Sequence, residues 1–153
     1  ETFDFVSALD VLEHIKKDEL AISEISRILK KNGTVVITVP HRMKFYTTQD
    51  KIIGHYRRYE INQILSLFKK FKLRNLKVFG VYGKLMRIAD IQSTNPNNIE
   101  QNIINLRNKY ESNFVFRKFW NIIVKFVSKL MKLDAKYHSN NSIRNLGLIF
   151  TKI

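Results

Sequence analysis

Two short apolar segments separated by an amphipathic stretch constrain the fold of this chain more than any other feature. Phe3 to Leu9 (FDFVSAL) and Thr34 to Val39 (TVVITV) are predicted strands, and we expect the first to be buried on both faces. Apolar residues at helical spacing between them predict a helix over Asp18 to Lys31, ending at a Gly33 cap. A strand–helix–strand unit of this length makes the two strands parallel and predicts an α/β fold.

The rest of the chain is predicted from the same kinds of pattern. We expect a polar, aromatic loop over Met43 to Tyr59, then a helix with apolar residues from Ile61 to Phe71 and an extended stretch from Leu73 to Tyr82. An asparagine-rich break at 95–98 precedes two helices, near Ile99 to Tyr110 and Val115 to Leu133. A final strand is expected over Asn145 to Ile153. Residues 1–153 are thus interpreted as one partial domain. It divides into a sheet and helix core (1–83), a helical insertion or lid (84–145) and a final strand (146–153).

Charge and composition narrow the classes of partner and compartment. The net charge is +14, and seven of the thirteen acidic residues fall between Glu1 and Glu24, so the remaining chain is strongly basic. This favours anionic partners, although a solvated lysine-rich surface explains it equally well. The chain contains no cysteine, no signal peptide and no apolar run long enough for a bilayer span, which together predict a cytoplasmic protein. Because the chain opens directly on a predicted strand, we expect it to begin inside a longer protein.

Ligands of parallel sheets collect beyond the carboxyl ends of the strands. In this chain those ends are Leu9 to His14 and Val39 to Lys44. We therefore expect any chemistry to lie there.

Three motifs occur in an order known from one enzyme family. They are FDFVSALDVLEHI, then EISRILKKNG before TVVITVPH, then QDKIIGHYRRYEINQIL. Together they resemble the carboxyl-terminal half of class I S-adenosylmethionine-dependent methyltransferases of the ubiquinone- and lipid-modifying type. The resemblance covers Glu1 to about Tyr82 and the final strand. It implies a Rossmann-like sheet with an antiparallel last strand, and S-adenosyl-L-methionine as the cofactor.

The chain also departs from the family pattern. The family's first strand ends in an acidic, glycine-rich loop, whereas the five glycines here (33, 54, 80, 83 and 147) are scattered. We therefore expect the amino-terminal half that holds most of the cofactor to be missing from this chain. The exposed sheet edge left behind would then be a liability.

The resemblance implies roles for the residues after the first strand. Leu9, Asp10 and Val11 would bind the cofactor, although Asp10 could equally be a capping or solvated carboxylate. Glu13 would bind substrate, and His14 would face the methyl-transfer space as a catalytic residue. The alternative for His14 is a histidine hydrogen-bonded to backbone.

The loop after the second strand supplies further candidates. His55 is predicted to be catalytic, and the predicted substrate-binding residues are His41, Asp50, Arg57, Arg58 and Tyr59. In this interpretation an arginine holds an anionic group with its planar guanidinium. Asp50 and Arg58 could instead only pin the loop. No metal site is expected, because the histidines lack any regular ligand spacing.

The segment from Phe114 to Leu133 has a basic strip opposite a broad apolar face. Lys118, Lys125, Lys129 and Lys132 share the strip, and no acidic residue interrupts it. This pattern is typical of a helix at an anionic membrane surface, but also of a lid helix packed on a core. It leaves membrane association open.

The sequence therefore favours methyl transfer from S-adenosylmethionine to a small-molecule, lipid or glycan acceptor. The alternative is a non-catalytic basic module that binds anionic membrane or nucleic acid. Nucleic-acid binding is the less favoured of these, because no RNA-binding motif accompanies the charge. The sequence predicts no oligomeric state.

Overall fold

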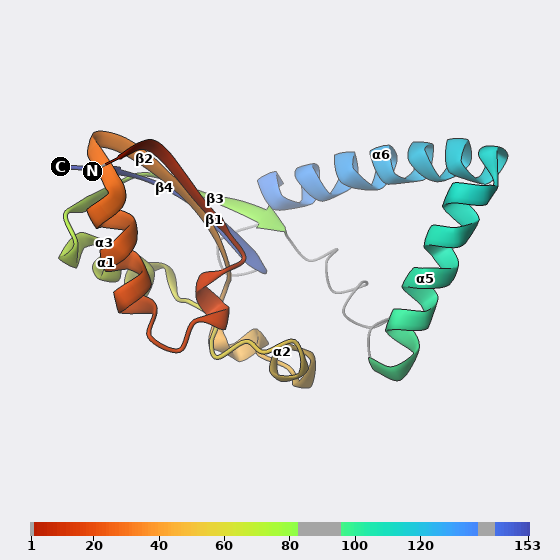
Figure 1. The fold of residues 1–153 in the computed structure, drawn as a ribbon, viewed down its shortest axis with the longest axis horizontal. Helices are drawn as coiled ribbons and strands as arrows, with labels where there is room; N and C mark the ends of the chain where they lie inside the picture. Colours follow the sequence, from red (N-terminus) through yellow and green to blue (C-terminus); the bar gives the residue numbers. More distant parts are fainter. Residues whose placement is uncertain (1, 83–95, 138–142) are drawn as a thin grey trace.

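Among the described residues, the strands form one four-stranded mixed sheet (Figure 1). The structure is a computed structural model that describes residues 2–82, 96–137 and 143–153. The strands are β1 (Phe3–Leu9), β2 (Leu29–Pro40), β3 (Leu73–Tyr82) and β4 (Asn145–Lys152). Their order is β1-β2-β4-β3, with β1 parallel to β2 and β4 antiparallel to both of its neighbours. This confirms the predicted α/β class and the antiparallel last strand.

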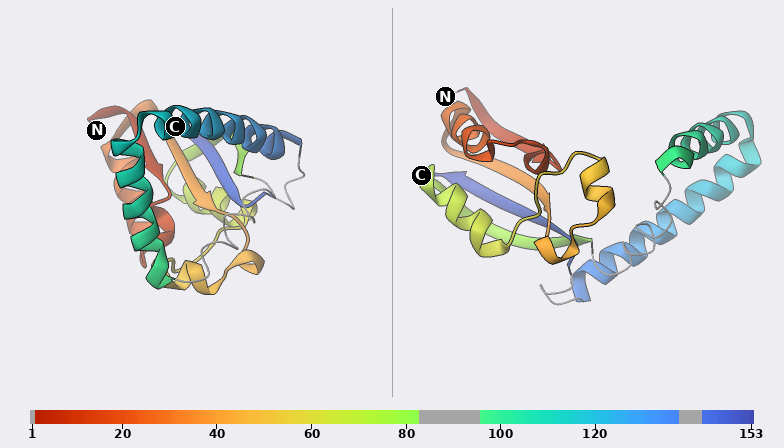
Figure 2. Two further views of the ribbon diagram at one scale, coloured as in Figure 1. Left: turned by 90° about the vertical axis from the view of Figure 1, so that its right-hand side faces the viewer. Right: turned by 90° about the horizontal axis from the view of Figure 1, so that it is seen from below.

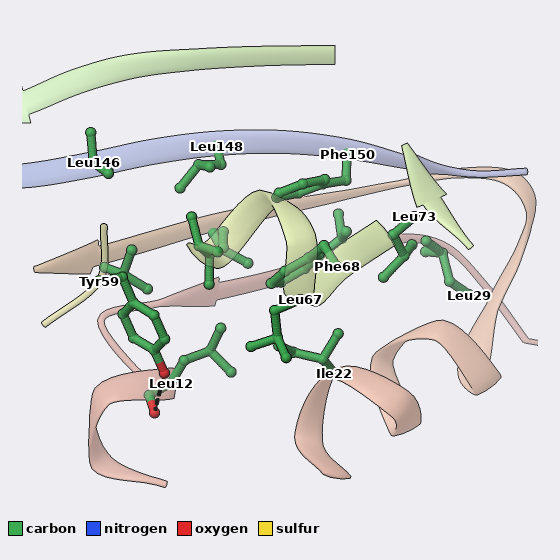
Figure 3. Packing of buried hydrophobic residues seen from close by; sticks show 14 of the residues in the cluster. Leu12, Ile22, Leu29, Tyr59, Leu67, Phe68, Leu73, Leu146, Leu148 and Phe150 are labelled. Atoms are coloured by element: carbon green, nitrogen blue, oxygen red, sulfur yellow. Dashed lines mark hydrogen bonds between the residues drawn. The ribbon is translucent and has the colours of Figure 1, made fainter. Parts of the chain in front are cut away.

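Two helices cover one face of the sheet and bury the core. Helices α1 (Asp18–Ile28) and α3 (Ile61–Lys70) turn their apolar sides toward β2 and β4 (Figure 3). The rings of Phe68 on α3 and Phe150 on β4 stack with centroids 4.2 Å apart, and both side chains are fully buried. This packing joins the last strand to the helical layer.

The boundary between α1 and β2 differs from the prediction. The helix ends at Ile28, and β2 begins at once with the buried Leu29, so Lys30 to Gly33 belong to the strand. The positive φ lies at Asn32 (64°) and not at Gly33. A Cβ on Gly33 would lie 2.8 Å from the Lys30 carbonyl oxygen, so this glycine allows close packing and is not a helix cap.

Strand β1 was predicted to be buried on both faces, and this is wrong. Phe3, Phe5 and Leu9 are 50%, 58% and 57% exposed. Within the described residues β1 is hydrogen-bonded only to β2, so one side of it is an open sheet edge. The partly buried Val6 and Ala8 pack on the core.

The predicted loop over Met43 to Tyr59 contains short helices. The 3-10 turn η2 (Met43–Phe45) precedes helix α2 (Thr48–Ile52). Asp50 closes a capping box with Thr47, which explains how such a short helix forms. Beyond α2, Gly54 has a φ of 84°, a conformation that favours glycine and turns the chain back toward the sheet.

Helices α5 (Pro96–Ser112) and α6 (Phe114–Tyr137) form a pair that extends away from the sheet (Figure 2). Both helices were predicted, and both are longer than expected. The predicted break at 95–98 is wrong for residues 96–98, because Pro96 suits the first turn of a helix. Residues 83–95 and 138–142 of the predicted insertion lie outside the described residues. In the described part of the chain, no helix has the length and apolar character to cross a bilayer.

Candidate functional site

An open pocket of about 340 Å³ lies where the carboxyl ends of β1 and β2 meet the loop around α2. It is lined by Asp10, Glu13, Pro40, Gln49, Asp50, Ile53, His55, Arg58, Arg144 and Asn145. β1 and β2 run parallel to each other, so their carboxyl ends lie at the same edge of the sheet. The pocket therefore lies where the sequence predicted ligand binding.

Asp10 holds a fixed carboxylate at the end of β1. Its φ of 52° ends the strand, and its backbone N–H donates to the Thr38 hydroxyl oxygen over 2.9 Å. Its Oδ1 accepts hydrogen bonds from Thr38 Oγ1 (3.0 Å) and from Asn145 Nδ2 (2.8 Å). Three strands thus position one carboxylate at the mouth of the pocket.

The chain then folds into the 3-10 turn η1 (Leu12–His14), which separates two chemically different side chains. Glu13 is buried, with 1% of its surface exposed, whereas His14 is exposed. Burial raises the pKa of Glu13 to about 7, and the nearby Asp10 carboxylate adds to the rise. Glu13 therefore exchanges protons near neutral pH, which an ordinary glutamate does not.

The residues after α2 are tied to η1 and to the start of α1. Tyr56 donates its backbone N–H to the Glu13 carbonyl over 2.8 Å. Arg57 donates to the Lys16 carbonyl oxygen (2.7 Å) and forms an ion pair with Asp18 (2.7 Å). The segment is thereby held across the carboxyl end of β1.

Asp50 organises the interior of this segment. Arg58 donates two hydrogen bonds to its two carboxylate oxygens over 2.9 and 2.8 Å, and Thr47 donates its backbone N–H over 2.8 Å. His55 Nδ1 lies 2.8 Å from Asp50 Oδ1. Burial alone would raise the pKa of Asp50, but these bonds outweigh it and lower the pKa below its usual range.

Five predicted site residues come together in the pocket: Asp10, Glu13, Asp50, His55 and Arg58. His14 lies next to them, because its ring meets the ring of His55 edge to face with centroids 4.6 Å apart. Leu9 and Val11 are exposed beside Asp10 and are not part of the pocket lining.

Three predicted substrate-binding residues lie elsewhere. Tyr59 is fully buried and donates its hydroxyl to Asp18 Oδ2 over 2.9 Å, with the Leu12 carbonyl 3.2 Å away (Figure 3). His41 is 2% exposed, and its Nδ1 donates to the Ile143 carbonyl over 3.1 Å. Arg57 is bonded to the Lys16 carbonyl and to Asp18, and it is not part of the pocket lining. These side chains support the fold around the pocket.

The sequence reasoning missed part of the lining. Gln49 and Ile53 come from α2 and the turn after it, and Arg144 and Asn145 come from the start of β4. An antiparallel strand beside β2 begins where β2 ends, so the predicted final strand could have suggested Asn145. The guanidinium of Arg144 lies 4.0 Å from the centre of the Phe45 ring, a contact between distant segments with no sequence signature.

The fold also gathers three side chains that can act as metal ligands. One ligand atom from each of Glu13, His14 and His55 lies within 4.8 Å of the other two. No metal site was expected from the sequence, because the histidines lack regular ligand spacing in the chain. Ligands contributed by η1 and by the turn after α2 do not produce such spacing.

Comparisons with known proteins bear on the fold of the chain. Residues 1–37 match the family model described as "Methyltransferase domain". No curated protein sequence matches the chain. The similarity to a family is therefore carried by the first strand, η1, α1 and most of β2.

Solved structures resemble the chain over nearly its whole length. Phosphoethanolamine N-methyltransferase 2 of Haemonchus contortus, in complex with S-adenosyl-L-methionine, is 23% identical with a TM-score of 0.53. The match covers 98% of this chain and 33% of that protein. The same enzyme in complex with phosphomonomethylethanolamine and S-adenosylhomocysteine is 21% identical, with a TM-score of 0.52 and the same coverage.

A third similar structure is the [4+2]-cyclase SpnF. It is 18% identical with a TM-score of 0.53, and the match covers 99% of this chain and 50% of SpnF. The chain thus spans about a third to a half of the length of these proteins. At such identities the likeness establishes the fold, and a cyclase on the same fold means that the reaction must be argued from the site.

Proposed function

Because the chain has the fold of class I S-adenosylmethionine-dependent methyltransferases, we propose that it takes part in methyl transfer from S-adenosylmethionine to an acceptor held in the pocket beyond β1 and β2. The observation that carries this proposal is the pocket itself. Asp10, Glu13, His55 and Arg58 converge on the sheet edge where α/β folds bind their ligands.

The cofactor is expected at the outer side of β1. Leu9 and Val11 are 57% and 41% exposed, and they flank the fixed carboxylate of Asp10. Apolar surface beside an oriented carboxylate suits the adenine and the charged methionine part of the cofactor. When bound, the cofactor supplies a methyl group on a positively charged sulfur. The acceptor atom bonds to the methyl carbon from the side opposite the sulfur, and the carbon–sulfur bond breaks. Because the glycines are scattered, we propose that this chain provides only part of such a site.

Two histidines are placed to receive a proton from the acceptor. His55 donates its Nδ1–H to the Asp50 carboxylate, which leaves Nε2 as a proton acceptor near the pocket. His14 is exposed next to it and lies against its ring. Arg58 lines the same wall, where two hydrogen bonds to Asp50 hold its guanidinium.

The acceptor is proposed to be a lipid-linked or otherwise membrane-associated molecule. In α6, Phe119, Ile122 and Phe126 are each more than 60% exposed. Lys118, Lys125 and Lys129 lie on the same helix. Exposed aromatic and aliphatic side chains combined with lysines suit the interface of an anionic bilayer.

Methyl transfer is tested with the full-length protein and radiolabelled S-adenosylmethionine. Acceptors are drawn from lipid, quinone and glycan fractions. His55→Ala is expected to lower kcat by about 100-fold or more, as for loss of a general base. Asp10→Ala is expected to weaken binding of S-adenosylhomocysteine about 10-fold, whereas Asp4→Ala, on the same strand but away from the pocket, should not. Unchanged turnover and cofactor affinity in both His14→Ala and His55→Ala would refute this placement of the site.

Membrane association is tested by flotation with vesicles of neutral or acidic phospholipid. We expect binding to acidic vesicles only, and loss of binding in a Phe119→Ser/Phe126→Ser variant. Leu76→Ser, an exposed apolar residue of β3, serves as the control. Equal flotation with neutral vesicles, or equal loss in the control, would contradict a role for α6. A protein that methylates acceptors without binding any vesicle would restrict the acceptor to soluble molecules.

A further inference from the structure

A buried carboxylate oxygen without a partner lies beneath the pocket. Glu13 is 1% exposed, and its Oε2 accepts no hydrogen bond from any described residue. Its Oε1 lies 3.9 Å from His55 Nε2, too far for a hydrogen bond. A carboxylate removed from water needs a cation or hydrogen-bond donors, and the described residues provide neither to Oε2 at bonding distance.

Two imidazole rings stand beside this carboxylate. His14 and His55 come from η1 and from the turn after α2, and their ring planes meet at 78°. The turn brings them together because Gly54, immediately before His55, adopts a positive φ and lies close to His14. Ligand atoms from all three residues lie within 4.8 Å of one another.

The orientation of His55 is set by a second layer of contacts. Its Nδ1 donates to Asp50, which is in turn held by two hydrogen bonds from Arg58. The lone pair of His55 is therefore on Nε2, the atom nearest to Glu13. A carboxylate that holds the far nitrogen of a histidine is the usual support of a metal-binding imidazole.

We propose that Glu13, His14 and His55 bind a divalent transition-metal ion such as Zn²⁺. Two imidazoles and one carboxylate match the ligand preferences of such ions and leave at least one coordination position open. Tetrahedral zinc holds its ligand atoms about 3.4 Å apart. The ligand atoms here lie within 4.8 Å of one another, so metal binding requires them to approach by up to about 1.4 Å.

A metal on His55 Nε2 would occupy the lone pair that the proposed methyl transfer uses to receive a proton, so the two roles exclude each other in one molecule. Bound Zn²⁺ is therefore expected to inhibit methyl transfer, and only this expectation rests on the proposed function. The metal site itself stands on the geometry of the three side chains.

The test is a titration of the chelator-treated full chain with Co²⁺, followed by the ligand-field absorption of the cobalt ion. We expect one Co²⁺ per chain, displaced by Zn²⁺. Glu13→Gln and His14→Ala should each weaken binding about 10-fold or more, and Asp50→Asn should weaken it about 10- to 100-fold. Glu24→Gln, an exposed carboxylate paired with Arg27, is the matched control and should bind as the wild type does.

Glu13→Gln keeps the size of the side chain, and His14 is exposed, so both variants are expected to fold. Their thermal unfolding without metal checks this. Zn²⁺ should raise the Tm of the wild type and not that of Glu13→Gln. No cobalt spectrum, or affinity that is unchanged in both variants, would overturn the proposal. Because the titration contains neither cofactor nor acceptor, a failure here leaves the methyl-transfer proposal standing, and the reverse also holds.

Discussion

Asp50 and His55 form the central contact of the pocket, with 2.8 Å between Asp50 Oδ1 and His55 Nδ1. The same carboxylate accepts two hydrogen bonds from Arg58 and one from the backbone of Thr47. One buried side chain thus closes the loop, caps α2 and orients an imidazole toward Glu13. Stability and pocket geometry depend on the same residue.

Asp50→Ala is expected to lower the free energy of unfolding by about 3 kcal/mol, because it leaves the half-buried Arg58 guanidinium without its partner. Urea denaturation measures the loss. Asp4→Ala removes an ion pair to Lys30 whose carboxylate is 82% exposed, and should cost less than about 1 kcal/mol. Equal losses in the two variants would show that the Asp50 network is not a stabilising unit.

Tyr59→Phe is expected to destabilise the protein by about 1–2 kcal/mol while leaving the acceptor KM and kcat unchanged. The hydroxyl is fully buried and donates to Asp18, so its loss affects folding and not acceptor binding. Denaturant unfolding and steady-state methyl transfer are measured on the same preparation. A raised KM with unchanged stability would instead support the prediction from the sequence that Tyr59 contacts the acceptor.

The stability of the protein is expected to decrease in acid through His41. Burial lowers the pKa of His41 below its ordinary value of 6.5, and its bond to the Ile143 carbonyl only partly offsets this. Between the folded and unfolded pKa values of His41, the unfolded chain binds more protons than the folded protein. The free energy of unfolding therefore falls as the pH drops below 6.5, and the stabilising contribution of neutral His41 is complete only above that pH.

His41→Asn removes this titration. Urea unfolding at a series of pH values should then show a smaller decrease in the free energy of unfolding below pH 6.5 than in the wild type. The raised pKa of Glu13 contributes a slope of the opposite sign. It is common to both proteins and cancels in their difference. Parallel curves for wild type and variant would contradict a lowered pKa at His41.

Gly147→Ala is expected to cost about 1–3 kcal/mol. A Cβ at this position of β4 would lie 2.4 Å from the ring of Phe79 on the paired strand β3. Combining the change with Phe79→Ala should remove most of the cost, which a double-mutant cycle measures. Additive losses would mean that the crowding lies elsewhere in the strand.

The sequence predicted the sheet well because its strands carry local signals. The β-branched run before Pro40 and the apolar ends of Phe3 to Leu9 are visible without tertiary context. The junction at Leu29 was missed because Lys30, Lys31 and Gly33 look like a helix end. The pairing of Leu29 with Phe3 overrides that local preference. The exposure of β1 could not be read from its composition, since burial depends on neighbouring strands.

The position of the pocket was predictable, but its full lining was not. The carboxyl ends of parallel strands predicted a ligand site near Leu9 to His14, and Asp10 and Glu13 do line the pocket. The functional roles of His14, His55 and Arg58 stay predictions. No sequence pattern distinguishes Tyr59, which is buried in the core, from its neighbour Arg58, which lines the pocket. That difference comes from the short parallel bridge between His41 and Tyr59, which fixes how the loop lies on the sheet.

The position of β4 between β2 and β3 also has a consequence for synthesis on the ribosome. β3 forms its described hydrogen bonds with β4 alone, and β4 follows both helices of the α5–α6 pair. While a nascent chain is still emerging, β2 and β3 cannot be joined, and both present open edges. The helical pair is complete before the sheet can close, so the open strand edges are exposed to wrong pairing during that interval of translation.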